Sequence, residues 1–147
     1  SYPVVVKPVL GGCGRGVVLC HDDGELVAAV KGCGGALIVQ EFIEGDDMDC
    51  DLVAVDGEIR AAAIRRGLGC KSQFGIPGNL WQFEEASSFL DSIRRLIREL
   101  RWSGAANIDG IRDRRNGEDK LLEINARLGS SHFGATAAGV NLPDVLV

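Results

Sequence analysis

Two acidic residues, Asp109 and Glu123, fall in segments that the sequence predicts to pair as neighbouring strands. The segments 106–113 and 119–125 flank Asn116-Gly117, and an Asn-Gly pair between extended runs is a strong hairpin signal. A three-residue loop centred on Asn116 places the Asp109 carboxylate directly opposite that of Glu123. Like charges that face each other destabilise a sheet. A divalent cation shared by the two carboxylates removes this repulsion, so the pair indicates a metal site.

The rest of the second strand supports this interpretation. Polar side chains alternate with apolar ones along it, in the order Leu122, Glu123, Ile124, Asn125, Ala126, Arg127. A period of two places the polar side chains on one face, although an ordinary solvated strand shows the same pattern. Because the candidate ligands Asp109, Glu123 and Asn125 offer only oxygen, the predicted ion is Mg²⁺ or Mn²⁺.

A glycine-rich segment near the start, GGCGRG at 11–16, is a candidate phosphate-binding loop. Glycines expose backbone N–H groups without a Cβ in the way, so such a loop can donate to phosphate oxygens. The residues concerned are Gly11, Gly12, Gly14, Arg15 and Gly16, with Lys7 at the end of the preceding strand. The alternative is a flexible hairpin tip. The spacing fits neither a Walker loop nor a dinucleotide fingerprint. Together, a phosphate loop and a magnesium pair indicate a nucleoside triphosphate site.

The segment VQEFIEGDD at 39–47 offers further contacts for a nucleotide. Glu41 and the backbone of Phe42 and Ile43 can meet an adenine edge, and Asp47 can accept hydrogen bonds from ribose hydroxyls. On chemistry alone the indication is weak, because acidic loops after strands are usually solvated.

Composition narrows the class of protein. The 147 residues carry a formal net charge of −5, with 46% hydrophobic and 25% charged residues, which is typical of a globular chain. A negative net charge argues against a nucleic-acid partner, and no apolar run approaches the ~20 residues of a membrane span. The five cysteines form no CxxC pair, which argues against a zinc site or a disulfide framework. We therefore expect a cytoplasmic protein.

The elements that must position these residues alternate between strands and helices, which predicts an α+β fold with a largely antiparallel sheet. Asp56-Gly57 predicts a second hairpin, and a sharp turn is expected at Gly45. The expected strands are 4–7, 17–20, 36–41 (buried), 48–55, 58–64, 106–113 and 119–125. The expected helices are 24–31, capped by Asp22 or Asp23, and 85–101. The glycine-rich segment 65–81 is expected to form a long loop that acts as a lid. Arg65 or Arg66 at its start would contact the substrate, and the alternative is that both are surface arginines.

Five segments, VVVKP, GGCGRG, VQEFIEGDD, NID and LLEINAR, occur in an order that resembles the ATP-grasp superfamily. GAANIDGI and AAGVNLP suggest the carbamoyl-phosphate-synthase large-chain-like branch. The resemblance implies two lobes that grip ATP between two mainly antiparallel sheets flanked by helices. It implies that Lys7 and residues 11–16 hold phosphates, that Glu41, Phe42 and Ile43 contact adenine, and that Asp47 binds ribose. It further implies that Asp109, Glu123 and Asn125 hold Mg²⁺, while Arg127, with Arg65 as a second candidate, faces the transferred phosphate.

The implied function is that of an ATP- and Mg²⁺-dependent ligase, which activates a carboxylate or bicarbonate as an acyl phosphate and transfers it to an amine or ammonia. Residues 1–43 would form a partial nucleotide lobe and residues 44–147 the lobe with the metal site. Members of the family normally carry preceding domains, so other domains of the same protein are expected partners, and a homo-oligomer is possible. The alternatives are a regulatory ATP-binding module without catalysis and a fragment that is inactive without its missing domains.

Overall fold

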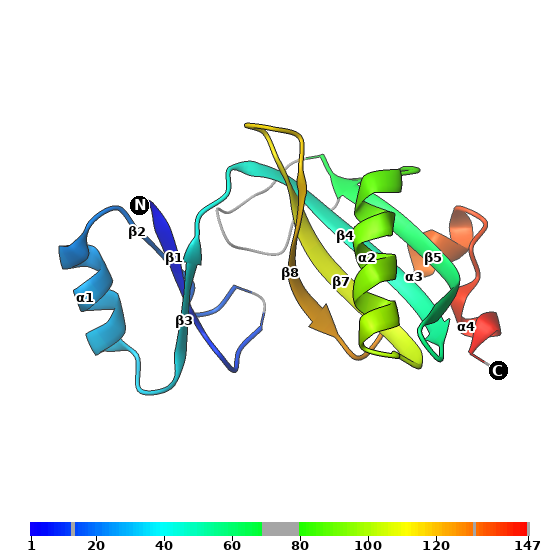
Figure 1. The fold of residues 1–147 in the computed structure, drawn as a ribbon, viewed down its shortest axis with the longest axis horizontal. Helices are drawn as coiled ribbons and strands as arrows, with labels where there is room; N and C mark the ends of the chain where they lie inside the picture. Colours follow the sequence, from blue (N-terminus) through cyan, green and yellow to red (C-terminus); the bar gives the residue numbers. More distant parts are fainter. Residues whose placement is uncertain (13, 69–79, 131, 147) are drawn as a thin grey trace. The chain divides into compact units, whose positions relative to one another are not determined.

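The computed structural model describes residues 1–12, 14–68, 80–130 and 132–146. The chain divides into two compact units, and the division falls between Ile43 and Glu44 (Figure 1). The second unit continues after Leu68 with residues 80–146. Every strand pair in both units is antiparallel, as the sequence predicts.

The first unit is a three-stranded sheet with one helix. Its elements are β1 (Val4–Pro8), β2 (Val18–Cys20), α1 (Asp23–Gly32) and β3 (Leu37–Glu41), and the strand order is β2-β1-β3. Asp22 caps α1, because its side chain accepts a hydrogen bond from the backbone N–H of Glu25 at 2.9 Å. The N-terminal cap is one of the two residues that the sequence predicts.

The prediction that 36–41 forms a buried strand is wrong in its burial. The strand forms as β3, but Ile38 is 40% exposed and Val39 is 50% exposed. β3 lies at the edge of the small sheet, and α1 contributes no buried residue to this unit. An apolar run therefore identified the strand correctly but could not report what covers it.

The second unit is a five-stranded sheet of order β6-β5-β4-β7-β8. Its elements are β4 (Gly45–Val55), β5 (Glu58–Gly67), β6 (Trp81–Phe83), α2 (Ser87–Glu99), β7 (Gly104–Asp113), β8 (Asp119–Asn125), α3 (His132–Ala137) and α4 (Leu142–Val145). Asp56 and Gly57 both adopt positive φ in the β4–β5 turn, which confirms the hairpin that the Asp-Gly pair predicts. None of the described helices is long and apolar enough to cross a membrane.

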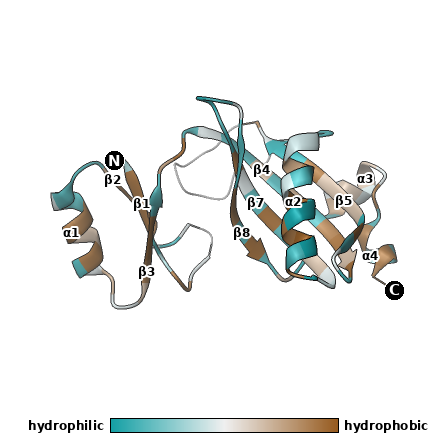
Figure 2. Ribbon diagram, in the orientation of Figure 1, coloured by the Kyte–Doolittle hydropathy of each residue, from teal (hydrophilic) through white to brown (hydrophobic). Residues whose placement is uncertain are grey.

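The core of the second unit lies where α2 crosses one face of the sheet (Figure 1). Phe89, Ile93 and Ile97 of α2 are fully buried against alternate residues of the central strands, such as Met48 and Ile108. The remaining surface of α2 is largely hydrophilic (Figure 2). A smaller apolar cluster on the other side of the sheet contains Val53, Ala63, Ala135 and Leu142. The remainder of the face opposite α2 carries polar side chains.

Several strands extend further than the sequence predicts. Gly45 does not turn the chain but begins β4, where a side chain would collide with Ile111 and with the Arg112 carbonyl of β7. Residues 65–67 and 81 belong to strands rather than to the expected loop, and residues 69–79, on which the lid prediction rests, lie outside the described residues.

The β7–β8 hairpin has the predicted register at its site end but reaches it by another route. Asp109 pairs with Glu123, and Asn107 pairs with Asn125. Near the turn, however, Arg112 pairs with Asp119, and residues 114–117 form an even-numbered loop, so the predicted odd loop is wrong.

A β-bulge opposite Asp109 and Gly110 shifts the pairing register of the two strands by one residue, because Leu122 is an extra residue without a partner in β7. As a result Leu121 and Ile124, not Leu122, pack against the α2 core. The predicted alternation therefore holds from Glu123 onward and fails before it.

We expect Gly110→Ala to lower the free energy of unfolding by about 1–3 kcal/mol, because overpacking forces the core to move. A Cβ at Gly110 would lie 2.5 Å from Phe89 Cε2 and 2.8 Å from the Lys120 carbonyl oxygen. The matched control is Gly67→Ala in β5, where the nearest atom is Asp47 Cβ at 3.4 Å. Thermal or urea unfolding of both variants checks the difference, and equal stability of the two contradicts the packing described here.

Candidate functional site

The face of the large sheet opposite α2 carries a row of charged residues in register across four strands. Arg65 of β5 pairs with Asp49 of β4, Asp49 with Asp109 of β7, and Asp109 with Glu123 of β8. Residues in register on neighbouring strands share a face, with Cβ atoms about 4.5–5.5 Å apart. Three carboxylates therefore stand side by side, with one guanidinium at the end of the row.

A second row lies directly beside the first. Asp51 pairs with Asn107, and Asn107 pairs with Asn125. The Asn107 amide donates to Asp49 Oδ2 at 3.1 Å and to Asp51 Oδ1 at 3.2 Å. This amide therefore satisfies oxygens of two buried carboxylates at once.

The crowding of carboxylates changes the protonation of the central residue. Burial, followed by repulsion from Asp49 and then from Glu123, raises the pKa of Asp109 to about 8. The cause named first from the sequence, repulsion by Glu123, is therefore only part of the effect. An uncompensated carboxylate in this place is unfavourable, which is the condition that a bound cation relieves.

The three predicted metal ligands, Asp109, Glu123 and Asn125, lie close together. The Asn125 amide donates to Asp109 Oδ2 at 3.4 Å and to Glu123 Oε1 at 3.2 Å. Within the described ranges, no group of three or more His, Cys, Asp or Glu side chains is arranged to hold a metal ion. Two carboxylates and one amide fit Mg²⁺, which typically takes one or two carboxylates and completes its shell with phosphate and water. The assignment of these three residues as ligands stays a prediction.

Arg65 is neither a surface arginine nor at the start of a loop. It is 3% exposed, its Nη2 lies 2.7 Å from Asp49 Oδ1, and its Nη1 lies 3.5 Å from Asp51 Oδ2. Its guanidinium also lies over the Trp81 ring, 5.0 Å from the ring centre. Arg65 therefore contacts two aspartates of this face, Asp49 and Asp51, directly.

The sequence analysis missed Asp49 and Asp51. The signal was present, because the two acids alternate with the apolar residues Met48, Cys50 and Leu52 along the same strand. An alternating strand of this kind has one face in the core and one face of carboxylates. Without knowledge of which strands pair, nothing connects these acids to Asp109.

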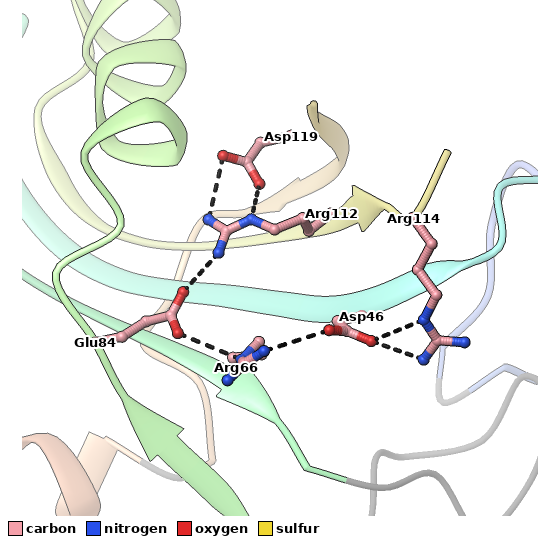
Figure 3. A network of polar contacts seen from close by, with 6 residues as sticks. All are labelled: Asp46, Arg66, Glu84, Arg112, Arg114 and Asp119. Atoms are coloured by element: carbon pink, nitrogen blue, oxygen red, sulfur yellow. Dashed lines mark hydrogen bonds and ion pairs between the residues drawn. The ribbon is translucent and has the colours of Figure 1, made fainter. Parts of the chain in front are cut away.

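Arg66 faces the other side of the sheet, where it belongs to a chain of ion pairs (Figure 3). Arg66 bridges Asp46 and Glu84 at 3.4 and 3.3 Å, and Glu84 accepts from Arg112 at 3.0 Å. The contacts at the ends of this chain are Arg114 to Asp46, Arg112 to Asp119, and the Ser88 hydroxyl to Asp119. The network joins β4, β5, β7 and β8 to the start of α2, so Arg66 is a structural residue of the α2 side.

Arg127 follows β8 and is exposed. Its backbone N–H donates to the Asn125 carbonyl at 2.8 Å, and its Nη1 donates to the Leu128 carbonyl at 3.1 Å. Its place two residues beyond Asn125 is consistent with the predicted contact to a transferred phosphate, which stays a prediction.

The predicted phosphate-binding residues lie in the first unit. Lys7 lies in β1, and the described glycines of the loop are exposed. Gly14 and Gly16 adopt positive φ (69° and 74°), a conformation that side chains rarely adopt. The backbone conformation at these two positions therefore favours glycine.

The residues predicted to contact adenine and ribose lie at the end of β3 and the start of β4. Glu41 is the last residue of β3, the Phe42 N–H donates to the Pro3 carbonyl at 3.3 Å, and Ile43 is half-buried. Asp47 is a strand residue of β4 rather than a loop residue, and burial raises the pKa of its carboxyl group. Their roles toward a nucleotide stay predictions.

Comparison with known proteins places this geometry in a family. Residues 34–147 match the family model described as ATP-grasp in the biosynthetic pathway with Ter operon. The chain belongs to the ATP-grasp family. This membership confirms the superfamily that the motifs suggest and the α+β fold, whereas the match does not specify the carbamoyl-phosphate-synthase-like branch.

Individual relatives of this ATP-grasp chain include ligases and a carboxylase. It is 36% identical over 177 residues to a D-alanine--D-alanine ligase of Desulfotalea psychrophila, covering 99% of this chain and 52% of that protein. An L-amino acid ligase from Bacillus licheniformis has a similar fold (TM-score 0.75, 24% identity, covering 99% of this chain and 38% of that chain). So does the biotin carboxylase domain of Hydrogenobacter thermophilus 2-oxoglutarate carboxylase, solved with MgADP and bicarbonate (TM-score 0.69, 23% identity, covering 90% and 32%). The chain spans between 27% and 52% of the curated relatives it matches.

We expect Asp109→Asn to stabilise the metal-free protein increasingly as the pH rises from about 4 toward 8. The folded protein keeps a proton on Asp109 that the unfolded chain releases near the ordinary value of 3.8, so the wild type loses stability over this window. The asparagine variant has no such proton to lose. Urea unfolding in the presence of EDTA at several pH values measures the difference.

The matched control is Asp91→Asn, because the Asp91 side chain is 65% exposed and pairs with Arg94 on the surface of α2. Its stability difference from the wild type should stay nearly constant over the same pH range. A parallel pH dependence for the wild type and Asp109→Asn contradicts the charge row as described.

Proposed function

We propose that this chain is part of an ATP- and Mg²⁺-dependent ligase that joins a small carboxylate to an amine through an acyl phosphate. The observation that carries the proposal is the row Asp49–Asp109–Glu123 with Asn125 beside it, on the face of an ATP-grasp sheet opposite α2. The names of its relatives, which ligate amino acids, support a ligase over other nucleotide-binding proteins. MgADP in the similar biotin carboxylase domain supports the choice of nucleotide and metal.

The predicted binding residues have separate proposed tasks. Asp109, Glu123 and Asn125 hold Mg²⁺, which offsets the negative charge of the ATP phosphates. Lys7 and the loop at 11–16 donate to phosphate oxygens, and Glu41, Phe42, Ile43 and Asp47 contact the nucleoside. Arg127 contacts the γ-phosphate, because a planar guanidinium suits a phosphoryl or carboxylate group.

In the proposed reaction the substrate carboxylate attacks the γ-phosphorus, and ADP departs. The amine then attacks the acyl carbon, and inorganic phosphate departs with the bond electrons. The residues of the chain chiefly orient the reactants and balance charge, as is general for phosphoryl transfer.

The intact protein, supplied with MgATP, carboxylates and amines, tests the proposal through release of ADP and phosphate. ADP release that needs both a carboxylate and an amine, with hydroxylamine trapping an acyl hydroxamate, supports it. Bicarbonate with ammonia as the productive pair places the protein in the carbamoyl-phosphate-synthase-like branch, and amino acids as the productive carboxylates place it outside. Nucleotide binding without ADP release over the whole panel contradicts a ligase and favours a regulatory module.

We expect saturating MgATP to raise the free energy of unfolding by about 2.7 kcal/mol at a hundredfold excess over the dissociation constant. Glu123→Ala should abolish this increase without lowering the stability of the ligand-free protein, because it also removes a charge that faces Asp109. Glu118→Ala is the control, since Glu118 lies in the β7–β8 turn and pairs with Lys120. Thermal unfolding with and without MgATP measures both, and an undiminished shift in Glu123→Ala contradicts the metal assignment.

A further inference from the structure

The backbone of Gly129 is bonded to a buried charge on the sheet. The Gly129 N–H donates to Asp51 Oδ1 at 2.5 Å, and Asp51 is 1% exposed. Asp51 lies in β4, and Gly129 lies in the segment between β8 and α3, 78 residues further along the chain. A carboxylate that accepts a backbone N–H forms a charge-assisted bond, which is shorter and stronger than a neutral one.

Asp51 is held in place from two other strands. Asn107 of β7 donates to the same Oδ1 at 3.2 Å, and Arg65 of β5 lies 3.5 Å from Oδ2. A buried carboxylate is costly without such partners. Burial raises the pKa of Asp51, and the Gly129 N–H acts in the opposite direction. The Asp51 side chain is therefore an acceptor that partners on two other strands hold in place.

The space above this cluster is tight for any residue larger than glycine. A Cβ at Gly129 would lie 3.0 Å from Asn107 Nδ2, 3.0 Å from Asp51 Oδ1 and 3.1 Å from Arg65 Nη2. All three atoms belong to side chains that contact one another, so a displacement of one of them disturbs the polar contacts of the others. Gly129 is thus packed directly onto polar atoms from three strands.

Gly129 is also held on its carbonyl side. Its oxygen accepts from the His132 N–H at 3.3 Å and lies 2.9 Å from His132 Nδ1. Both backbone polar groups of Gly129 are therefore engaged, the N–H with the sheet and the carbonyl with the start of α3. This contact gives His132 a structural role.

Arg127, two residues earlier, has no such anchor of its own. Its described hydrogen bonds join it to Asn125 and Leu128, which are its near neighbours in sequence. The position of the exposed Arg127 side chain therefore depends on the backbone that carries it. That backbone is fixed by β8 before Arg127 and by Gly129 after it.

We propose that Asp51 is a positioning residue: held by Arg65 and Asn107, it clamps the Gly129 backbone and so fixes the segment that presents Arg127 to the substrate. This inference rests on the proposed function, in which Arg127 contacts the γ-phosphate. It assigns Arg65 to the support of Asp51 rather than to contact with substrate. A displacement of a catalytic group by about 1 Å costs up to about a hundredfold in rate, so a clamp of this kind matters for turnover.

Hydrogen exchange of the Gly129 amide tests the clamp itself, with no need for activity. Asp51→Ala should expose this amide and raise its exchange rate by about tenfold or more. Asp51→Asn, which keeps an acceptor oxygen, should restore most of the protection. The matched control is Asp49→Asn, which removes a buried carboxylate from the same strand face with the same Arg65 and Asn107 partners but has no bond to Gly129.

Gly129→Ala provides a second route to the same result if Asp51→Ala does not fold, because it displaces the backbone and leaves every charge in place. It should raise the exchange rates of residues 127–130 without melting the sheet. Equal exchange of the residue-129 amide in the wild type and in whichever of Asp51→Ala and Gly129→Ala folds overturns the clamp.

A double-mutant cycle on ADP release tests the link to Arg127. Asp51→Ala should lower the carboxylate-dependent kcat about tenfold, with little change in the KM for ATP, and Asp51→Asn should recover most of the loss. In an Arg127→Ala background the same Asp51→Ala change should have almost no further effect. Multiplying losses overturn the link, because a merely structural defect acts equally in both backgrounds.

Failure of the proposed function has a different signature. A wild-type protein that releases no ADP on the full panel overturns the ligase, and with it the role of Arg127, while Gly129 exchange still decides whether Asp51 clamps the segment. A wild-type protein that turns over normally, with Gly129 exchange insensitive to Asp51, overturns the clamp alone.

Discussion

The candidate site depends on three carboxylates that stand in register on one face of the large sheet. Asp49, Asp109 and Glu123 repel one another, and Arg65 supplies a positive charge at one end of the row. The end at Arg65 is buried and neutralised within the protein. The end at Glu123 is exposed, so its charge is available to a cation from outside. In the proposed function, the uncompensated charge at the Glu123 end is the part of the row that binds the metal ion of MgATP.

The two arginines that follow each other in β5 show how one strand serves both faces of a sheet. Arg65 lies with the acidic row and the Trp81 ring, whereas Arg66 lies in the ion-pair network on the α2 side. The network ties the start of β8 to α2 through Asp119 and Ser88, and so holds the strand that carries Glu123. Arg65 thus contacts the acidic row directly, whereas Arg66 belongs to the network that holds β8, the strand that carries Glu123.

Sequence reasoning found the pairing of Asp109 with Glu123 because hydrophobic alternation and an Asn-Gly turn are local signals. It gave the wrong loop length, because a bulge contributes one residue that alternation cannot reveal in advance. It missed Asp49 and Asp51, because their relation to Asp109 depends on β4 pairing with β7, a contact between residues nearly 60 positions apart. The exposure of β3 was equally hidden, since an apolar run does not show which layer covers it.

The bulge at Leu122 separates the turn of the β7–β8 hairpin from its functional end. Because the pairing changes phase between them, the loss of one loop residue can be absorbed by straightening the bulge, and the acidic row keeps its alignment. The distal turn is therefore open to insertion and deletion during divergence, whereas the two strand segments beyond the bulge are not. Variation in length among related chains should accumulate on the turn side of this point.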